Sequence, residues 1–183
     1  MTPTIVVITG ASGAGKTASV RALAARNLPG VSCYYFDADG VPSPEEMEKF
    51  PENWQAMKTR EWLTRLASDP DGAEVYILDG QVRPSFVYEA AEQTLAKAPH
   101  IILLDCTPSV RHTRLRELRQ QPELVTTQMD CWAAYLRGQA DALKLPVIDT
   151  TNVEISDVAD SLVAIIESLC EPQRHATSYA WKQ

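Results

Sequence analysis

The sequence lacks any long apolar stretch. No hydrophobic run approaches the roughly 20 consecutive residues that a helix needs to cross a membrane. The apolar run Ile5–Ile8 is also far too short for the central part of a signal peptide. We therefore expect a soluble, cytoplasmic protein without a membrane partner.

Cysteine and histidine are scarce and scattered. The four cysteines are Cys33, Cys106, Cys131 and Cys170, and they include no C-x-x-C pair. No histidine lies near enough in the sequence to complete a zinc site with any of them. This pattern argues against a zinc site and is typical of small core residues in a reducing cytosol.

Positive charge is also in short supply. The chain has 17 lysines and arginines against 24 aspartates and glutamates, which gives a net charge of −7. An acidic chain is a poor candidate for non-specific binding to nucleic acid, so we expect no nucleic-acid partner. With 183 residues, 45% of them hydrophobic, the chain suits one compact domain with a sizeable core.

One short segment does carry a specific motif. The stretch VITGASGAGKTAS, residues 7–19, fits the pattern G-x-x-x-x-G-K-[ST] at every fixed position from Gly10 to Thr17. An apolar run precedes it and a helix-like stretch, Ala18–Arg26, follows it, which is the context that a phosphate-binding loop requires. The sequence therefore predicts a nucleotide site made by Gly10, Ala11, Ser12, Gly13, Ala14, Gly15, Lys16 and Thr17.

Each fixed residue of this loop has a physical role. The glycines let the backbone turn tightly and present its N–H groups to phosphates at a helix N-terminus. Lys16 is expected to reach the β- and γ-phosphates of ATP, and the Thr17 hydroxyl to bind Mg²⁺.

Apolar runs and helical segments alternate along the chain, which predicts an α/β fold with a parallel sheet between helices. The strands are expected at Thr4–Thr9, Val31–Phe36, Glu74–Asp79, His100–Asp105 and Pro146–Asp149. The helices are expected at Lys16–Asn27, Pro44–Phe50, Asn53–Ser68, Pro84–Lys97, Pro108–Arg119, Pro122–Leu143 and Ile155–Leu169. We expect one P-loop NTPase domain over residues 1–170 with a five-stranded sheet and a short lid. The tail 171–183 has no periodicity and is expected to be mobile.

A second acidic position follows the third predicted strand. The stretch VYILDGQVRP places Asp79 at the carboxyl end of a buried strand, where an aspartate can hold Mg²⁺ together with Thr17. The alternative is a turn residue, because Asp-Gly is a common turn signal. The spacing from Asp79 to Arg83 resembles the D-G-x-x-R segment of adenylate kinases. That resemblance implies that Arg83 contacts the anionic group of a phosphate acceptor.

The second predicted strand also ends in carboxylates. Asp37 and Asp39 lie at the edge of the sheet where ligands bind in α/β proteins, and either could orient or deprotonate an attacking hydroxyl. The alternative is a solvated acidic turn. The Asp37-Ala38-Asp39 segment, the proline-led stretch after it and Trp62 resemble the acceptor region of gluconate kinases. The resemblance implies an acceptor-binding region at about 38–70, with Asp39 as a catalytic residue.

The basic residues gather in one helix. The segment from Pro108 to Met129 holds Arg111, His112, Arg114, Arg116 and Arg119. In small P-loop kinases this place holds a lid whose arginines stabilise charge on the transferring phosphoryl group. The R-L and T-Q-M stretches again resemble gluconate kinases, which implies a lid at about 111–128. Arg114 and Arg119 are then catalytic candidates, with the choice between Arg116 and Arg119 left open; the alternative is a solvated helix.

The class of nucleotide user follows partly from what is absent. The N-K-x-D segment of GTPases and the signature of transporter ATPases are both missing. The resemblance to gluconate, shikimate and adenylate kinases implies an ATP- and Mg²⁺-dependent kinase, a transferase acting on a small-molecule acceptor. The segment GASGAGKTASVRALAA also resembles P-loop adapter proteins that regulate RNA turnover. A regulatory protein acting through a partner, and a simple ATP hydrolase, therefore stay open.

The phosphate loop generates a first prediction. Lys16→Ala is expected to abolish ATP turnover, because the charge facing the β- and γ-phosphates is removed. The fold should persist, which circular dichroism can check beside a steady-state assay of ADP release. Turnover at the wild-type rate in this variant would show that the active site lies elsewhere.

Overall fold

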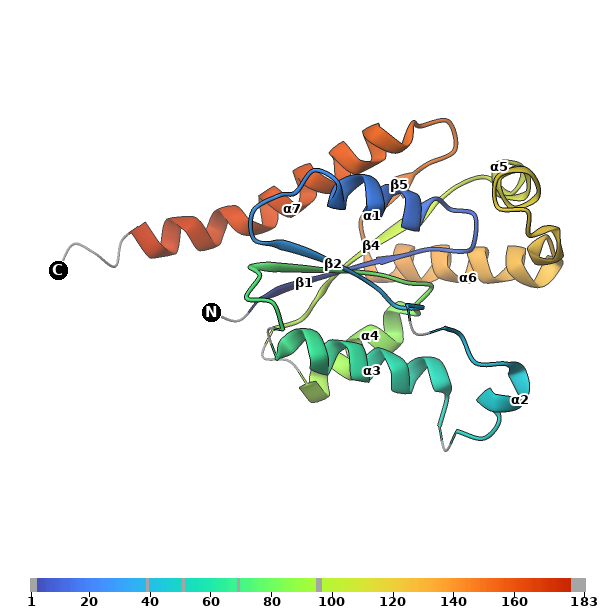
Figure 1. Cartoon of the computed structure of the whole chain (residues 1–183), viewed down its shortest axis with the longest axis horizontal. Helices are drawn as coiled ribbons and strands as arrows, with labels where there is room; N and C mark the ends of the chain where they lie inside the picture. Colours follow the sequence, from blue (N-terminus) through green and yellow to red (C-terminus); the bar gives the residue numbers. More distant parts are fainter. Residues whose placement is uncertain (1–2, 39, 51, 69, 95–96, 179–183) are drawn as a thin grey trace.

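The computed structural model describes residues 3–38, 40–50, 52–68, 70–94 and 97–178. A five-stranded sheet forms the centre of the molecule, as the sequence predicts, and its order is β2-β3-β1-β4-β5 (Figure 1). All the pairings are parallel. The strands are β1 (Thr4–Thr9), β2 (Val31–Tyr35), β3 (Val75–Asp79), β4 (His100–Asp105) and β5 (Val147–Asp149).

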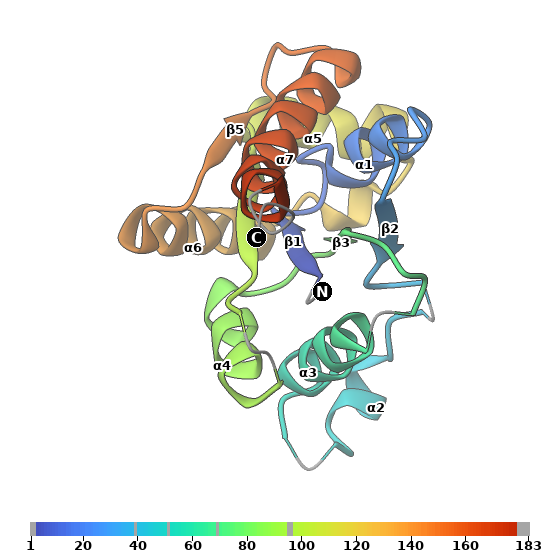
Figure 2. The same ribbon diagram turned by 90° about the vertical axis from the view of Figure 1, so that its left-hand side faces the viewer.

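Helices cover both faces of this sheet. The larger ones are α1 (Lys16–Ala24), α3 (Trp54–Ala67), α4 (Pro84–Thr94), α6 (Thr127–Leu143) and α7 (Ile155–Ser178). Shorter ones are α2 (Pro44–Met47), α5 (Pro108–Thr113), a π-helical turn η1 (Arg114–Leu118) and a 3₁₀ turn η2 (Pro122–Leu124). Helices α1 and α7 lie on one face, and α3 and α4 lie on the other (Figures 1 and 2).

Alternate side chains of the central strand, β1, pack into two separate hydrophobic cores. Val6 and Ile8 of β1 pack with α1 and α7, whereas Ile5 and Val7 pack with α3 and α4. Every residue of β1 and β3 is buried, because strands covered on both faces bury both sets of alternating side chains. This explains why the two strands read as almost continuous apolar runs in the sequence.

The strand register fixes the edge at which a ligand can bind. Ile8 of β1 lies opposite Asp79 of β3, and Tyr35 of β2 lies opposite the same aspartate. The carboxyl ends of β1, β2 and β3 therefore meet at one edge, beside the turn that leads into α1. Ligands of open α/β sheets bind outside the carboxyl ends of the strands, at the switch point where the strand order reverses.

The helical segment after β4 differs from the single helix expected at Pro108–Arg119. Helix α5 gives way at Arg114 to the wider π-helical turn η1. The Arg119 N–H donates to the Arg114 carbonyl, five residues back, instead of to a carbonyl four residues back. Such widened turns occur often at functional sites, and this one shifts the register of the arginines that follow.

Two other helix boundaries were predicted wrongly. The expected helix Pro122–Leu143 is interrupted after η2, because the Thr126 side chain accepts a hydrogen bond from the Met129 N–H and caps a new helix there. Helix α7 continues to Ser178 instead of ending at Leu169, so the expected aperiodic tail is helical over most of its length. A helix already formed gains one hydrogen bond for each residue added, and it can therefore extend into a polar segment.

Within the described residues, none of the helices is both long and apolar enough to cross a membrane.

The packing of α3 beneath the sheet generates a stability prediction. Leu66 is fully buried among β1, β3 and α4, so Leu66→Ala is expected to lower the free energy of unfolding by about 2–5 kcal/mol. Leu143, which is 44% exposed at the end of α6, is the matched control, and its change to alanine should cost about 0.5 kcal/mol or less. Urea denaturation measures both, and equal losses would contradict this description of the core.

Candidate active site

The phosphate loop joins β1 to α1 through glycines with positive φ angles. Gly13 and Gly15 have φ angles of 84° and 92°, in the left-handed region that favours glycine. At Gly10 a Cβ atom would lie 2.2 Å from the Leu104 carbonyl oxygen of β4. The loop thus packs too closely on the sheet for any larger residue, and its N–H groups turn toward the N-terminus of α1.

Lys16 begins α1 with its ammonium group held at the loop. The residue is 9% exposed, and its Nζ donates to the Ala11 carbonyl at 3.1 Å. Desolvation lowers the pKa of Lys16, while the Asp79 carboxylate raises it. A buried cation with one carbonyl partner would gain strongly from an anionic phosphate beside it.

The structure brings Thr17 and Asp79 into direct contact. The Thr17 hydroxyl donates to Asp79 Oδ2 at 2.6 Å, and Asp79 Oδ1 is buried without a hydrogen-bond partner among the described residues. Burial raises the pKa of Asp79, and the Lys16 ammonium lowers it. A hydroxyl and an orphaned carboxylate oxygen at a phosphate loop fit Mg²⁺, which prefers few protein ligands and completes its shell with phosphates and water.

Larger clusters of metal-binding side chains are lacking in the part of the chain that the structure describes. It contains no group of three or more histidines, cysteines, aspartates or glutamates placed to hold a metal ion. The Thr17–Asp79 pair is therefore suited to a metal that arrives with a nucleotide, and not to a permanent all-protein cage.

Arg114 lies against the phosphate loop. Its Nη1 donates to the Thr150 hydroxyl at 2.9 Å and to the Gly13 carbonyl at 3.4 Å, and its Nη2 donates to the Thr150 carbonyl at 2.5 Å. Thr150, just after β5, donates in turn to the Ala14 carbonyl at 2.9 Å. The sequence predicted a lid arginine facing the phosphates, whereas this guanidinium binds the back of the loop.

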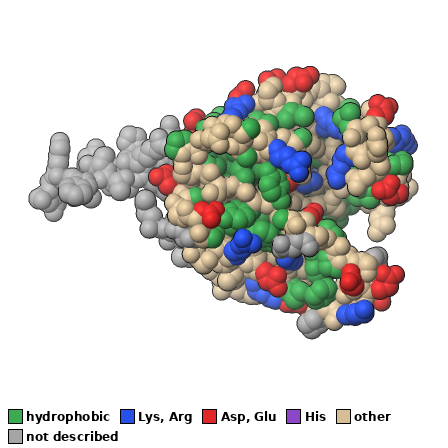
Figure 3. All heavy atoms as spheres, in the orientation of Figure 1, with side chains coloured by type: hydrophobic (Ala, Val, Ile, Leu, Met, Phe, Trp, Pro, Cys, Tyr) green, Lys and Arg blue, Asp and Glu red, His purple; other side chains and the backbone are tan. Residues whose placement is uncertain are grey.

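A cavity of about 440 Å³ opens beside the phosphate loop. Its lining residues are Ser12, Lys16, Thr17, Arg21, Tyr35, Asp37, Ala38, Asp79, Gly80, Gln81 and Arg119. Of the predicted lid arginines, Arg119 lines this cavity, while Arg116 is exposed and does not. Desolvation by the surrounding protein atoms raises the pKa of Asp37, and the Lys16 ammonium group lowers it. Figure 3 shows the molecule hollowed on the side where α2 faces α5.

The base of the predicted lid is fixed by a buried arginine. Arg111, 2% exposed, donates through Nη2 to Asp130 at 2.6 Å and through Nη1 to the Cys106 carbonyl at 3.3 Å. His112 Nε2 lies 3.0 Å from the same Asp130 carboxylate. Hydrogen bonds to Arg111 and His112 lower the pKa of Asp130. These contacts join α5 to α6, so the two helices that flank the lid segment hold a fixed relative position.

Arg83 does not line the cavity. Its guanidinium lies 4.9 Å from the Phe86 ring centroid, 5.3 Å from that of Trp132 and 5.9 Å from that of Tyr135. Its Nε atom is buried without a hydrogen-bond partner among the described residues. The structure therefore places this arginine in an aromatic cluster between α4 and α6, outside the residues that line the cavity.

Five lining residues were not among the predicted site residues, namely Arg21, Tyr35, Ala38, Gly80 and Gln81. Arg21 lies one helical turn beyond Thr17 on α1, a spacing that could have pointed to it. The side-chain oxygen of Gln81 accepts a hydrogen bond from the Ser12 hydroxyl at 3.0 Å, and its backbone carbonyl accepts one from Gln55 Nε2 at 2.7 Å. Tyr35 carries no sequence signal beyond its place at the end of β2. The predicted catalytic Asp39 lies outside the described residues.

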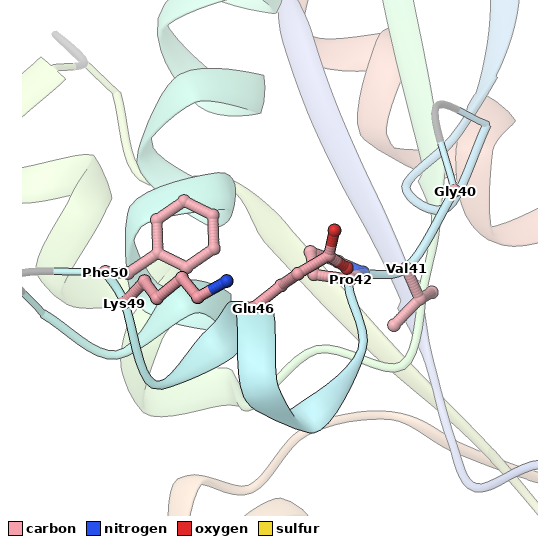
Figure 4. Close-up of a pocket in the computed structure, with 6 residues that line it drawn as sticks. All are labelled: Gly40, Val41, Pro42, Glu46, Lys49 and Phe50. Atoms are coloured by element: carbon pink, nitrogen blue, oxygen red, sulfur yellow. The ribbon is translucent and has the colours of Figure 1, made fainter.

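A second cavity, of about 560 Å³, lies within the predicted acceptor-binding region. Gly40, Val41 and Pro42 form one side, and Glu46, Lys49 and Phe50 form the other (Figure 4). Glu46 also accepts a hydrogen bond from the Ser43 N–H at 2.8 Å and so caps α2. This cavity therefore combines an apolar surface with an ammonium group and a carboxylate, at the segment that follows β2.

Comparison with protein families gives a match over most of this domain. Residues 6–133 match the profile of the family described as "AAA domain". A curated nucleotide-binding protein of Bacillus velezensis is 28% identical over 164 residues, which are 87% of this chain. The chain spans about half the length of that relative, 51%.

Solved structures give the fold a second line of support. A shikimate kinase from Acinetobacter baumannii in complex with shikimate has a TM-score of 0.62 at 20% identity, covering 91% of this chain and 94% of that one. A gluconokinase from Sinorhizobium meliloti has a TM-score of 0.56 at 17% identity, covering 96% and 98%. The predicted P-loop NTPase fold of small-molecule kinases is thereby confirmed.

The contact between Thr17 and Asp79 generates the prediction for this site. Asp79→Asn keeps the shape of the side chain but removes its charge, so the Mg²⁺ concentration for half-maximal ATP turnover is expected to rise. Titration of the rate against Mg²⁺ measures the effect, with Asp141→Asn on the exposed side of α6 as control. An unchanged metal requirement would assign Asp79 to the turn alone.

Proposed function

The chain belongs to the AAA domain family, and on that premise we propose that it is an ATP-dependent phosphotransferase acting on a small-molecule acceptor. One observation carries the proposal: a single cavity is lined by the phosphate-loop residues Lys16 and Thr17, by Asp79, and by the acceptor-side carboxylate Asp37. An ATP-binding protein that only switches conformation does not need a carboxylate across from the phosphates.

In the proposed reaction an acceptor hydroxyl attacks the γ-phosphorus, and the bond from that phosphorus to the β–γ bridging oxygen breaks. Asp39 takes the hydroxyl proton, and Asp37 supports the same hydroxyl from the end of β2. Lys16 and Arg119 face the charge that develops on the transferring group. ADP and the phosphorylated acceptor leave as products.

Mg²⁺ belongs to this proposal because the donor set suits it. Thr17 and Asp79 would hold the ion, which supplies positive charge to neutralise the phosphates. The Arg114 contacts support a different role from the one that the sequence suggested. We propose that Arg114 holds the phosphate loop in its binding conformation, and that it affects the rate of transfer in this indirect way.

We also place this activity in the cytoplasm. The cysteines whose side chains the structure describes, Cys33, Cys106 and Cys131, are free thiols, which suits a reducing compartment.

A screen for acceptors tests the proposed function directly. ADP release is measured for purified protein with ATP and Mg²⁺, alone and with sugar acids, nucleoside monophosphates and amino alcohols. Stimulation above the basal rate by one class, together with a phosphorylated product seen by mass spectrometry, is the expected result. Lys16→Ala serves as the blank, since any signal that it retains comes from a contaminant.

A nucleotide-binding regulatory protein is the second candidate. The 28% identity to the Bacillus velezensis nucleotide-binding protein favours it, because that relative is described by nucleotide binding alone. A regulator should bind ATP or ADP tightly without any acceptor raising turnover. Calorimetric titration with both nucleotides, run beside the acceptor screen, separates the two candidates.

Asp39 generates the sharpest test of the transfer chemistry. Asp39→Asn is expected to cut acceptor phosphorylation by roughly 10²–10⁴-fold, the usual contribution of a general base. Slow hydrolysis by water should survive. ATP affinity should change little, because Lys16 and the loop are untouched.

Asp37→Asn is the comparison variant, with a smaller expected loss of phosphorylation. Full acceptor activity in Asp39→Asn would remove that residue from the mechanism. Loss of ATP binding would place it on the nucleotide side.

A further inference from the structure

The cavity beside the phosphate loop has two chemically different ends. Ser12, Lys16 and Thr17 of the phosphate loop line one end together with Arg119. The end toward β2, the edge strand of the sheet, is lined by Tyr35, Asp37 and Ala38, with Arg21 of α1 beside Tyr35.

Arg21 is the cation of the β2 end. It points from α1 toward β2, where its guanidinium lies 5.9 Å from the ring centroid of Tyr35. Among the described residues it makes no ion pair, although it lies near enough to Asp79 to lower the pKa of that carboxyl. Contact with the Tyr35 ring and a side-chain hydrogen bond with Tyr35 orient the guanidinium, and its remaining N–H groups can bind a ligand.

The other arginines near the site are engaged elsewhere. Arg111 is paired with Asp130, Arg114 binds Gly13 and Thr150, and the guanidinium of Arg83 contacts aromatic rings outside the cavity lining. Arg119 lies with Lys16 at the phosphate end. Arg21 and Arg119 are thus the guanidinium groups that line the cavity, and Arg21 is the one beside β2.

We propose that Arg21, oriented by Tyr35, binds an anionic group of the phosphate acceptor while Asp37 faces its reactive hydroxyl. The inference rests on the proposed phosphotransferase function and deepens it. The acceptor is then a small molecule that carries both a hydroxyl and a carboxylate or phosphate group. Its size is limited, because a cavity of about 440 Å³ must also receive the γ-phosphate. Arg21, and not Arg83, selects the anionic acceptor.

Matched acceptors test this assignment. Each set contains a neutral polyol, the acid with one terminal carbon oxidised to a carboxylate, and the polyol phosphate monoester. We expect the wild-type protein to show a KM for one anionic member at least about 10-fold below that of the polyol. The choice between carboxylate and phosphate identifies the group that Arg21 binds. Equal KM values across a set would overturn the proposal.

Variants locate the effect at one side chain. Arg21→Gln is expected to raise the KM for the preferred anionic acceptor by about 10–100-fold, with a smaller change in kcat and in the KM of the polyol. Arg21→Lys should restore part of the loss, since it keeps the charge without the planar fork. Arg137→Gln, on α6 and outside both the cavity and the predicted acceptor-binding region, is the matched control. An unchanged KM in Arg21→Gln would overturn the assignment.

Failure of the proposed function has a separate signature. If no acceptor stimulates ADP release, calorimetric titration of the same anionic compounds into the ADP-bound protein still tests Arg21. Binding that Arg21→Gln abolishes and Arg137→Gln retains would support the anion site without transfer chemistry. Equal binding by both variants, or none by the wild-type protein, would overturn it.

Discussion

The conformation of the phosphate loop depends on what binds its carbonyl oxygens. A loop that presents its N–H groups to a phosphate turns several carbonyls the other way, toward the protein interior. Lys16 Nζ donates to the Ala11 carbonyl, Arg114 to that of Gly13 and Thr150 to that of Ala14. These donors come from three parts of the chain. The loop is therefore held in its binding shape by side chains as well as by its glycines.

This bracing links the loop to the rest of the fold. Thr150 follows β5 and its N–H donates to the Asp105 carbonyl at the end of β4, so one threonine joins two strand ends to the loop. Arg114 begins the π-helical turn, and Arg111 one turn earlier is buried against Gly13 and paired with Asp130 of α6. The widened turn also carries Arg119 to the cavity. The segment 111–119 thus supports the phosphate loop at one end and lines the cavity at the other.

Sequence reasoning succeeded where backbone chemistry alone decides the structure. Positive φ angles and close packing at Gly10 and Gly13 follow from the spacing of the motif, and the buried strands follow from uninterrupted apolar runs. It did not predict the contacts of long side chains. The guanidinium groups of Arg83 and Arg114 contact aromatic rings and carbonyls from distant segments. No local pattern encodes such partners, because they are chosen by tertiary packing.

Hydrogen bonds through one glutamine connect the predicted acceptor region to the nucleotide side. Gln55 of α3 donates to the Gln81 backbone carbonyl, and the Gln81 side chain accepts from Ser12, so Gln81 links α3 to the phosphate loop. Asp37 lines the cavity from the end of β2, whereas Arg21 reaches the same cavity from α1. The loop motif occurs in proteins of many functions and reports only the nucleotide. Arg21 and Asp37 are therefore more informative about the acceptor than the motif is.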